Sequence, residues 1–219
     1  MDMGLKFVYE AGEAEITEKK SRFIGTAVPV RSEEEALALI AARKKKYWDA
    51  RHNCWAFVVG DRQQLQRCSD DGEPQGTAGR PILDVLLGAD VHDTLIIVTR
   101  YFGGVLLGTG GLVRAYTKAA SDALSASAVV TRESGFLLTL AADYNSLGKI
   151  QYLLAQREIV TMEARYTDGV ELDVIVPEEK ITELESALTE GTAGRIRFAS
   201  KKETVFAMLG KEPILWEDL

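Results

Sequence analysis

Apolar and polar positions in the first half of the chain predict a mixed α+β domain. Residues 94–102 include four consecutive apolar positions, 95–98, without alternation, which is typical of a strand covered on both faces. Further strands are predicted by the loose alternation over residues 12–30 (a pair) and by the largely apolar segment 53–60. A weaker strand is predicted across a short turn, over residues 64–68. Helices are predicted after the capping box Ser32–Glu35, over residues 82–88, and over residues 112–127.

The second half of the chain predicts a separate domain. Its elements alternate as strand 136–143, helix 144–158, strands 159–166 and 170–176, a helix opened by Pro177, and strand 195–207. The order β-α-β-β-α-β is that of the ferredoxin-like plan. A boundary near residues 130–135 then divides the chain into domains 1–131 and 132–219.

Charge and composition narrow the class of protein. The chain has 219 residues and a net charge of −7, with 16 Lys and Arg against 17 Asp and Glu in residues 1–130, and 10 against 16 in residues 131–219. Neither part is basic enough to indicate nucleic-acid binding by composition alone. The first 20 residues lack the apolar core of a signal peptide, and no apolar run approaches a membrane span. With only two cysteines, Cys54 and Cys68, we expect a cytoplasmic protein with reduced thiols.

Residues 100–116, RYFGGVLLGTGGLVRAY, concentrate glycine between a predicted strand and a predicted helix. The spacing fits neither the dinucleotide fingerprint, where Val113 takes the third glycine position, nor the P-loop, where Thr109 takes the lysine position. A helix beginning near Gly110 or Gly111 offers free N–H groups that, with Arg100 and Arg114, suit a phosphate. The alternative is that the glycines only allow close packing and that both arginines are solvated or paired with carboxylates.

A second dense segment is RCSDDGEPQGTAGRPILD, residues 67–84. Asp70, Asp71 and Glu73 are candidate ligands of a divalent cation, but Asp-Asp-Gly-Glu-Pro is also typical turn sequence, and the turn is the favoured interpretation. The small residues that follow, at 76–79, form a loop that can lie close to a neighbouring backbone. No metal site is therefore assigned.

His52 and Cys54 lie two positions apart on a predicted strand and share a face. A catalytic Cys–His pair has no third orienting group at a recognisable spacing, and a zinc site with Cys68 lacks a fourth ligand. A histidine hydrogen-bonded within the strand is the simpler interpretation. The alternative function to test is a small cytosolic hydrolase or phosphate-handling enzyme with a site around His52, Cys54 and Asp70.

Taken together, four motifs resemble the signature of the YigZ/IMPACT family. They are SRFIG (21–25), HNCWAF (52–57), SDDGEPQGTAGRPIL (69–83) and TRYFGGVLLGTGGLVRAY (99–116). The resemblance implies an N-terminal domain of the ribosomal-protein and elongation factor G domain IV type, and a C-terminal domain like the last domain of that factor. It also implies a role in translation, since the family's eukaryotic members are translational regulators. One departure is Leu106, where the family often has a lysine in the glycine loop.

These observations predict a binding protein rather than an enzyme, without a cofactor and without a membrane segment. The expected partner is RNA, the ribosome or a translation-associated protein, with Arg80, Arg100 and Arg114 contacting phosphates and Tyr101 or Phe102 stacking on a base. The predicted binding surface comprises His52, Cys54, Asp70, Asp71, Gly72, Glu73, Gly76, Thr77, Gly79, Arg80, Arg100, Tyr101, Phe102, Gly103, Gly104, Gly108, Gly110, Gly111 and Arg114.

Overall fold

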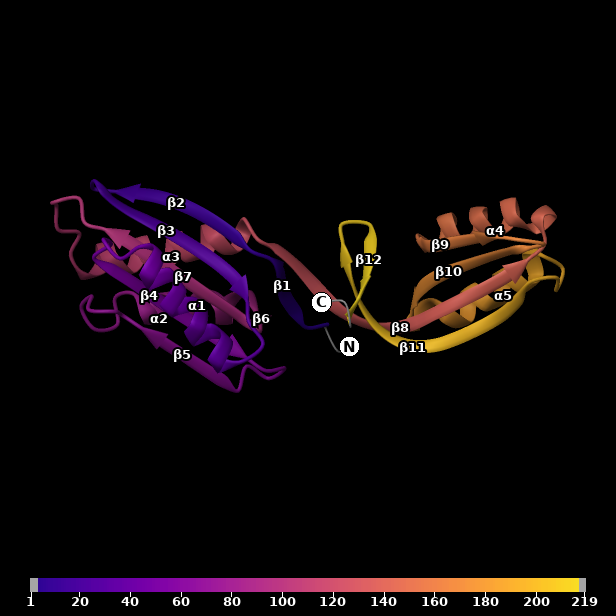
Figure 1. Ribbon diagram of the computed structural model, residues 1–219, viewed down its shortest axis with the longest axis horizontal. Coiled ribbons are helices and arrows are strands. Elements are labelled where there is room, and N and C mark those ends of the chain that lie inside the picture. Colours follow the sequence, from indigo (N-terminus) through magenta and orange to yellow (C-terminus); the bar gives the residue numbers. More distant parts are fainter. Residues whose placement is uncertain (1–3, 217–219) are drawn as a thin grey trace. The chain divides into compact units, whose positions relative to one another are not determined.

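The chain divides into two compact units, Met1–Val130 and Thr131–Leu219 (Figure 1). A computed structural model describes residues 4–216. Residues 1–3 and 217–219, which the predicted domain bounds include, lie outside the described residues. Each unit has its own apolar core.

The first unit is built on a five-stranded sheet in the order β2-β3-β7-β4-β5, in which every neighbouring pair is antiparallel. Its strands are β2 (Gly12–Glu18), β3 (Ser21–Pro29), β4 (His52–Val59), β5 (Leu65–Ser69) and β7 (Thr94–Tyr101). Two short strands outside this sheet, β1 (Lys6–Glu10) and β6 (Val91–His92), pair in parallel. The sequence pattern did not indicate either strand, because segments this short carry too few positions for a periodicity.

Helices cover both faces of this sheet (Figure 1). On one face α1 (Glu33–Lys46) packs through Ala36 and Ile40 against Leu95 and Ile97 of β7. On the other face α2 (Gly79–Ala89) and α3 (Thr109–Ser125) share a core with Ile96 and Val98. Both faces of β7 are therefore buried, which explains the unbroken apolar run at this strand.

The second unit is a four-stranded antiparallel arrangement with helices on one face. Its strand order is β11-β8-β10-β9, and β12 extends the β11 side as a hairpin. Leucines, isoleucines and valines of the strands and of the two helices form one core. The elements are β8 (Ala128–Ala142), α4 (Tyr144–Gln156), β9 (Thr161–Tyr166), β10 (Val170–Pro177), η1 (Glu178–Lys180), α5 (Ile181–Gly191), β11 (Arg197–Leu209) and β12 (Glu212–Leu215).

Within the described part of the chain, no helix is both long enough and apolar enough to cross a membrane.

Candidate functional site

A buried ion pair fixes the loop of residues 70–79 to the first sheet. The Arg100 guanidinium at the end of β7 donates to Glu73 Oε1 at 2.5 Å, and the two side chains are only 6% and 4% exposed. The Tyr116 hydroxyl of α3 donates to the same oxygen at 2.8 Å. Arg100 also donates to Ser21 Oγ on β3 at 3.3 Å. The Glu73–Arg100 ion pair therefore joins the loop to β7 and β3 and to α3.

His52 and Cys54 of β4 both lie against the loop of residues 70–79, but they contact different backbone carbonyl groups of it. His52 Nδ1 is 2.8 Å from the carbonyl oxygen of Asp71, and its Nε2 is 3.8 Å from Glu73 Oε1. The Cys54 sulfur lies 2.9 Å from the carbonyl oxygen of Asp70 and 3.3 Å from the Tyr116 hydroxyl. Burial raises the pKa of the Cys54 thiol, and the carboxylates of the loop raise it further. A thiol in this setting stays protonated and is a poor nucleophile.

The Asp70 carboxylate accepts hydrogen bonds from backbone N–H groups at the start of α2. Its Oδ1 accepts from the backbone N–H groups of Ala78 at 3.0 Å and Gly79 at 2.9 Å, and its Oδ2 accepts from Gly76 at 2.8 Å. Burial raises the pKa of this carboxyl, but the three N–H groups lower it more, so the net shift is downward. Asp70 thus acts as the counter-charge of the helix start.

Asp71 ties the loop to α1 and β4. Its Oδ2 accepts from the Asn53 backbone N–H at 2.6 Å, and its Oδ1 accepts from Lys44 Nζ at 2.5 Å. The acidic residues of the segment therefore have partners within the protein. Among residues 4–216 there is no group of three or more histidine, cysteine or carboxylate side chains arranged to hold a metal ion.

The glycine loop begins where β7 meets the β2–β3 turn. The Gly103 N–H donates to Ser21 Oγ at 3.2 Å, and a Cβ at this position would overlap the backbone of Lys20. The Arg51 guanidinium lies 5.6 Å from the centre of the Phe102 ring. Tyr101 points instead to Asp49, to which its hydroxyl donates at 2.8 Å.

Other predicted site residues lie outside the buried network. Arg80 is exposed and forms an ion pair with Asp84, one turn along α2, rather than with Glu73 of the buried network. Arg114 is exposed and lines a small hollow of about 210 Å³ with Lys19 and Lys118. Thr77 is buried and its hydroxyl donates to the Pro74 carbonyl, whereas Gly72, Gly104, Gly108 and Gly110 are exposed.

For Arg100 the structure decides between the two alternatives left open by the sequence. Arg100 is paired with a carboxylate, and its burial keeps it from a phosphate on the surface. Arg114 remains exposed. The predicted surface thus consists of a buried network around Glu73 and an exposed rim around the glycine loop.

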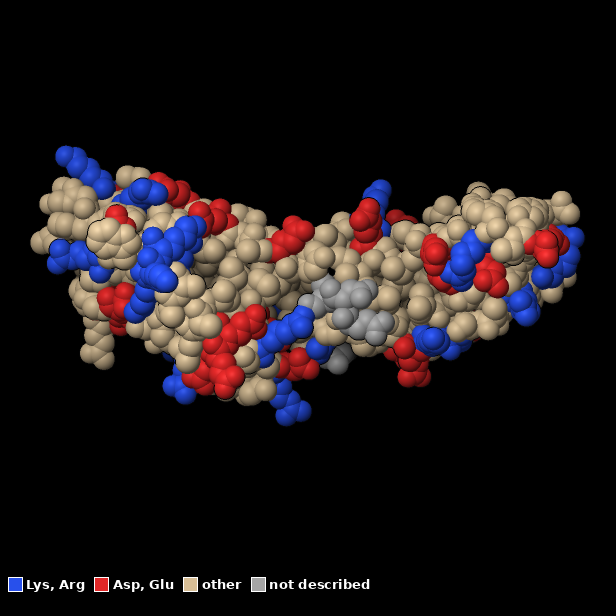
Figure 2. Space-filling model, viewed as in Figure 1, with Lys and Arg blue, Asp and Glu red and all other residues tan. Residues whose placement is uncertain are grey.

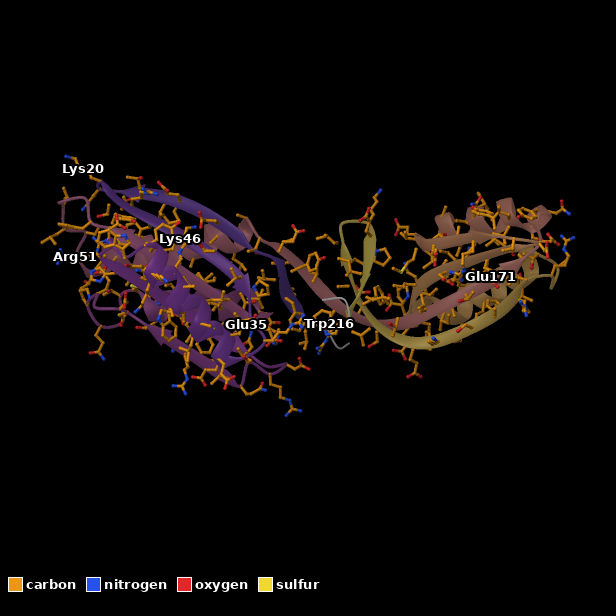
Figure 3. The ribbon with its side chains drawn as sticks, in the orientation of Figure 1. Lys20, Glu35, Lys46, Arg51, Glu171 and Trp216 are labelled. Atoms are coloured by element: carbon orange, nitrogen blue, oxygen red, sulfur yellow. The ribbon has the colours of Figure 1, made fainter. Side chains whose placement is uncertain are left out.

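Four exposed basic and aromatic residues beside this rim, Lys20, Lys46, Trp48 and Arg51, were not selected from the sequence. We define the basic end as these four residues together with Phe102, which the sequence did predict. Trp48 is 82% exposed and Phe102 is 40% exposed. Figure 3 shows Lys20 and Arg51 at one end of the first unit and Lys46 farther in on the same face, and Figure 2 shows several blue side chains on this part of the surface. The segment KKKYWDAR (44–51), a basic run with two aromatic residues, could have indicated three of these residues, Lys46, Trp48 and Arg51.

Comparison with known proteins follows the same division of the chain. Residues 19–124 match the model described as the Impact N-terminal domain, and residues 140–195 match a domain of unknown function, DUF1949. "IMPACT family member YvyE" of Bacillus subtilis is 44% identical over 188 residues, which cover 86% of this chain and 87% of that protein. The chain belongs to the IMPACT family.

The chain is also similar to other proteins over most of its length. "IMPACT family member YigZ" of Escherichia coli is 38% identical over 188 residues, covering 84% of this chain and 92% of that protein. A solved structure, "Crystal structure of an hypothetical protein", is 34% identical with a TM-score of 0.57 and covers 90% of this chain and 97% of that one. The resemblance drawn from the sequence motifs is therefore confirmed, as is a two-domain fold of mixed α+β type.

Proposed function

We propose that this IMPACT family protein is a translation-related regulator that binds single-stranded RNA, including exposed strands of ribosomal RNA, through the first unit. The observation that carries the proposal is the basic end, where exposed aromatic rings lie among exposed cations. Cations neutralise phosphates and aromatic rings stack on unpaired bases, which is the usual combination in single-strand binding.

The geometry around the glycine loop brings these groups together. Gly103 packs on the backbone of Lys20. Phe102 immediately precedes Gly103 in the chain, and its ring lies beside the Arg51 guanidinium. Lys46 and Trp48 follow at the end of α1, with Lys46 Nζ 5.1 Å from the Tyr47 ring. The buried network also contacts this arrangement, because the Arg100 guanidinium lies 5.6 Å from the centre of the Phe102 ring. The network residues are thus supports, and the exposed residues are the proposed contacts.

The overall charge limits how strong this binding is. The chain carries −7, and the first unit is close to neutral, so general attraction to RNA is small. Affinity must come from a few local phosphate contacts and from stacking. Binding is therefore expected to be weak at physiological salt and to require unpaired bases.

We further propose the ferredoxin-like fold for the second unit, from its β11-β8-β10-β9 order. For the first unit we propose the ribosomal-protein type of fold implied by the sequence motifs. Domain bounds of 1–131 and 132–219 accompany these assignments. A cytoplasmic setting is supported by the two free cysteines, Cys54 and Cys68.

The proposal is tested by fluorescence anisotropy with a labelled oligouridine of about 12 nucleotides, a length within the usual single-strand site sizes. If three phosphates are contacted, the logarithm of affinity falls with the logarithm of salt with a slope of about −2, from about 0.7 per phosphate. The triple change K20A/K46A/R51A should bring the slope near zero. W48A should weaken binding by about fivefold to a hundredfold at every salt concentration through lost stacking.

The control is K6A/R31A/R62A, which removes three exposed cations elsewhere on the first unit. It removes the same charge and should leave the slope unchanged. Equal losses in both triple variants, or no binding of oligouridine at low salt, would overturn the RNA proposal. Retention on ribosomes without oligouridine binding would favour a protein-binding regulator.

A further inference from the structure

The outer edge of the second unit is formed by β9, Thr161–Tyr166. In the described part of the chain β9 pairs only with β10. Four of its six residues are exposed, among them Met162 at 41% and Tyr166 at 57%. An exposed strand edge offers unpaired N–H and C=O groups to another strand.

The side chains of β9 are complementary to themselves in an antiparallel pairing. If two copies pair with Ala164 at the two-fold axis, Glu163 of each copy lies opposite Arg165 of the other. Met162 lies at a bulge in the pairing of β9 with β10, so the regular register is taken only over residues 163–166. Opposite charges placed directly across an antiparallel pair are stabilising. A two-fold interface requires this kind of self-complementarity.

The existing pairing supports the orientation of these side chains. Glu163 and Arg165 both lie on the face away from the helices, where Arg165 donates to Glu163 Oε2 at 2.6 Å and to Asp173 Oδ2 at 2.5 Å. Ala164 packs toward the core on the helix side. Glu171 and Asp173 belong to β10, roughly 10 Å from a second β9 at two strand spacings. This distance is about a Debye length in physiological salt, so their extra negative charge is largely screened.

Three other edge strands within residues 4–216, β2, β5 and β12, lack this complementarity. β2 carries Glu13 and Glu15 at exposed positions, so a second copy would meet like charges. The central residue of β5 is Arg67, which would face another Arg67 in a symmetric pairing. β12 contains Pro213, which has no N–H to donate. Such features protect strand edges, whereas the two charges on β9 are of opposite sign and related by the axis.

We propose that the protein forms a homodimer through antiparallel pairing of β9 with β9 of a second copy, which makes one continuous sheet across the two second units. A contact of one strand pair is at the small end of specific interfaces, so the dimer is weak and depends on concentration. The proposal is independent of RNA binding, which was assigned to the first unit.

Sedimentation velocity from about 10 µM to about 500 µM tests the proposal, a range suited to a weak interface. The wild-type protein should shift from a species of 24.0 kDa toward twice that mass. E163R places arginine opposite Arg165 in both halves of the interface and should weaken association by about tenfold or more. The double variant E163R/R165E exchanges the charges and should restore it.

E190R is the matched control, because it makes the same charge change at an exposed site on α5. It should associate as the wild type does. Circular dichroism checks that each variant is folded, and restoration by the double variant cannot come from misfolding. A protein that remains monomeric up to about 500 µM, or whose association is indifferent to E163R, would overturn the proposal.

Discussion

Glu73 is the residue on which the candidate site depends. Its carboxylate is 4% exposed and accepts from both Arg100 and Tyr116. A buried charge without its partner is costly, whereas an exposed ion pair contributes little. The protein contains an ion pair of each kind: Glu73–Arg100 is buried, whereas Arg80 and Asp84 form an ion pair on the surface of α2 with side chains 64% and 55% exposed.

We therefore predict that E73Q destabilises the protein by about 3–5 kcal/mol, because it leaves the Arg100 charge buried and uncompensated. D84N makes the same chemical change at the exposed pair and should cost no more than about 0.5 kcal/mol. Urea unfolding followed by circular dichroism measures both. Similar costs for the two variants would show that the Glu73–Arg100 pair is not buried as described.

At the scale of elements, the glycine loop joins β7 to α3 and packs against the β2–β3 turn. Only some of its glycines are required by contacts. Gly103 lies so close to the backbone of Lys20 that a side chain has no room. A Cβ at Gly110, in the first turn of α3, would instead meet only Arg114 NH1, at an ordinary contact distance of 3.6 Å. The glycines in this loop therefore serve different purposes.

G103A is predicted to destabilise the first unit by about 1–3 kcal/mol, because the loop must move away from β3. G110A is predicted to stabilise it by about 0.4–1 kcal/mol, because alanine favours the helix and restricts the unfolded chain. Thermal unfolding of the two single variants gives the sign of each effect. The explanation by close packing fails if G103A is as stable as G110A.

The sequence predicted the elements better than the contacts between them. The strand over 94–102 and the helices after Ser32 and after the glycine loop follow from local periodicity, which needs only neighbouring residues. The pairing of Arg100 with Glu73 depends on how β7 approaches a loop 27 positions earlier, and local patterns carry no such information. The exposure of Trp48 could not be predicted from the sequence either, because tryptophan side chains are largely buried on average.

At the scale of the whole molecule, two separate cores predict two units that unfold independently. Leu86 of α2 and Leu184 of α5 are both fully buried, one in each core. L86A and L184A should each cost about 2–5 kcal/mol, but in different units. Hydrogen exchange measured by mass spectrometry should show faster exchange of protected amides within 4–130 for L86A and within 131–216 for L184A.

Loss of protection in both units from either change would contradict this prediction, because it would mean that the two cores unfold as one. The conservative changes L86M and L184M retain most of the side-chain volume and serve as controls. They should leave exchange in the other unit unchanged as well.

The Asp70 carboxylate at the start of α2 has a consequence for competition. A group tethered by a few residues is present at an effective concentration on the order of millimolar or more, and it does not diffuse away. A free phosphate approaching the N–H groups of Gly76, Ala78 and Gly79 therefore competes with a ligand that the chain itself supplies. The start of α3 has no such internal competitor, because its cap is Gly108. Of these two helix starts, the chain leaves only that of α3 open to an anion.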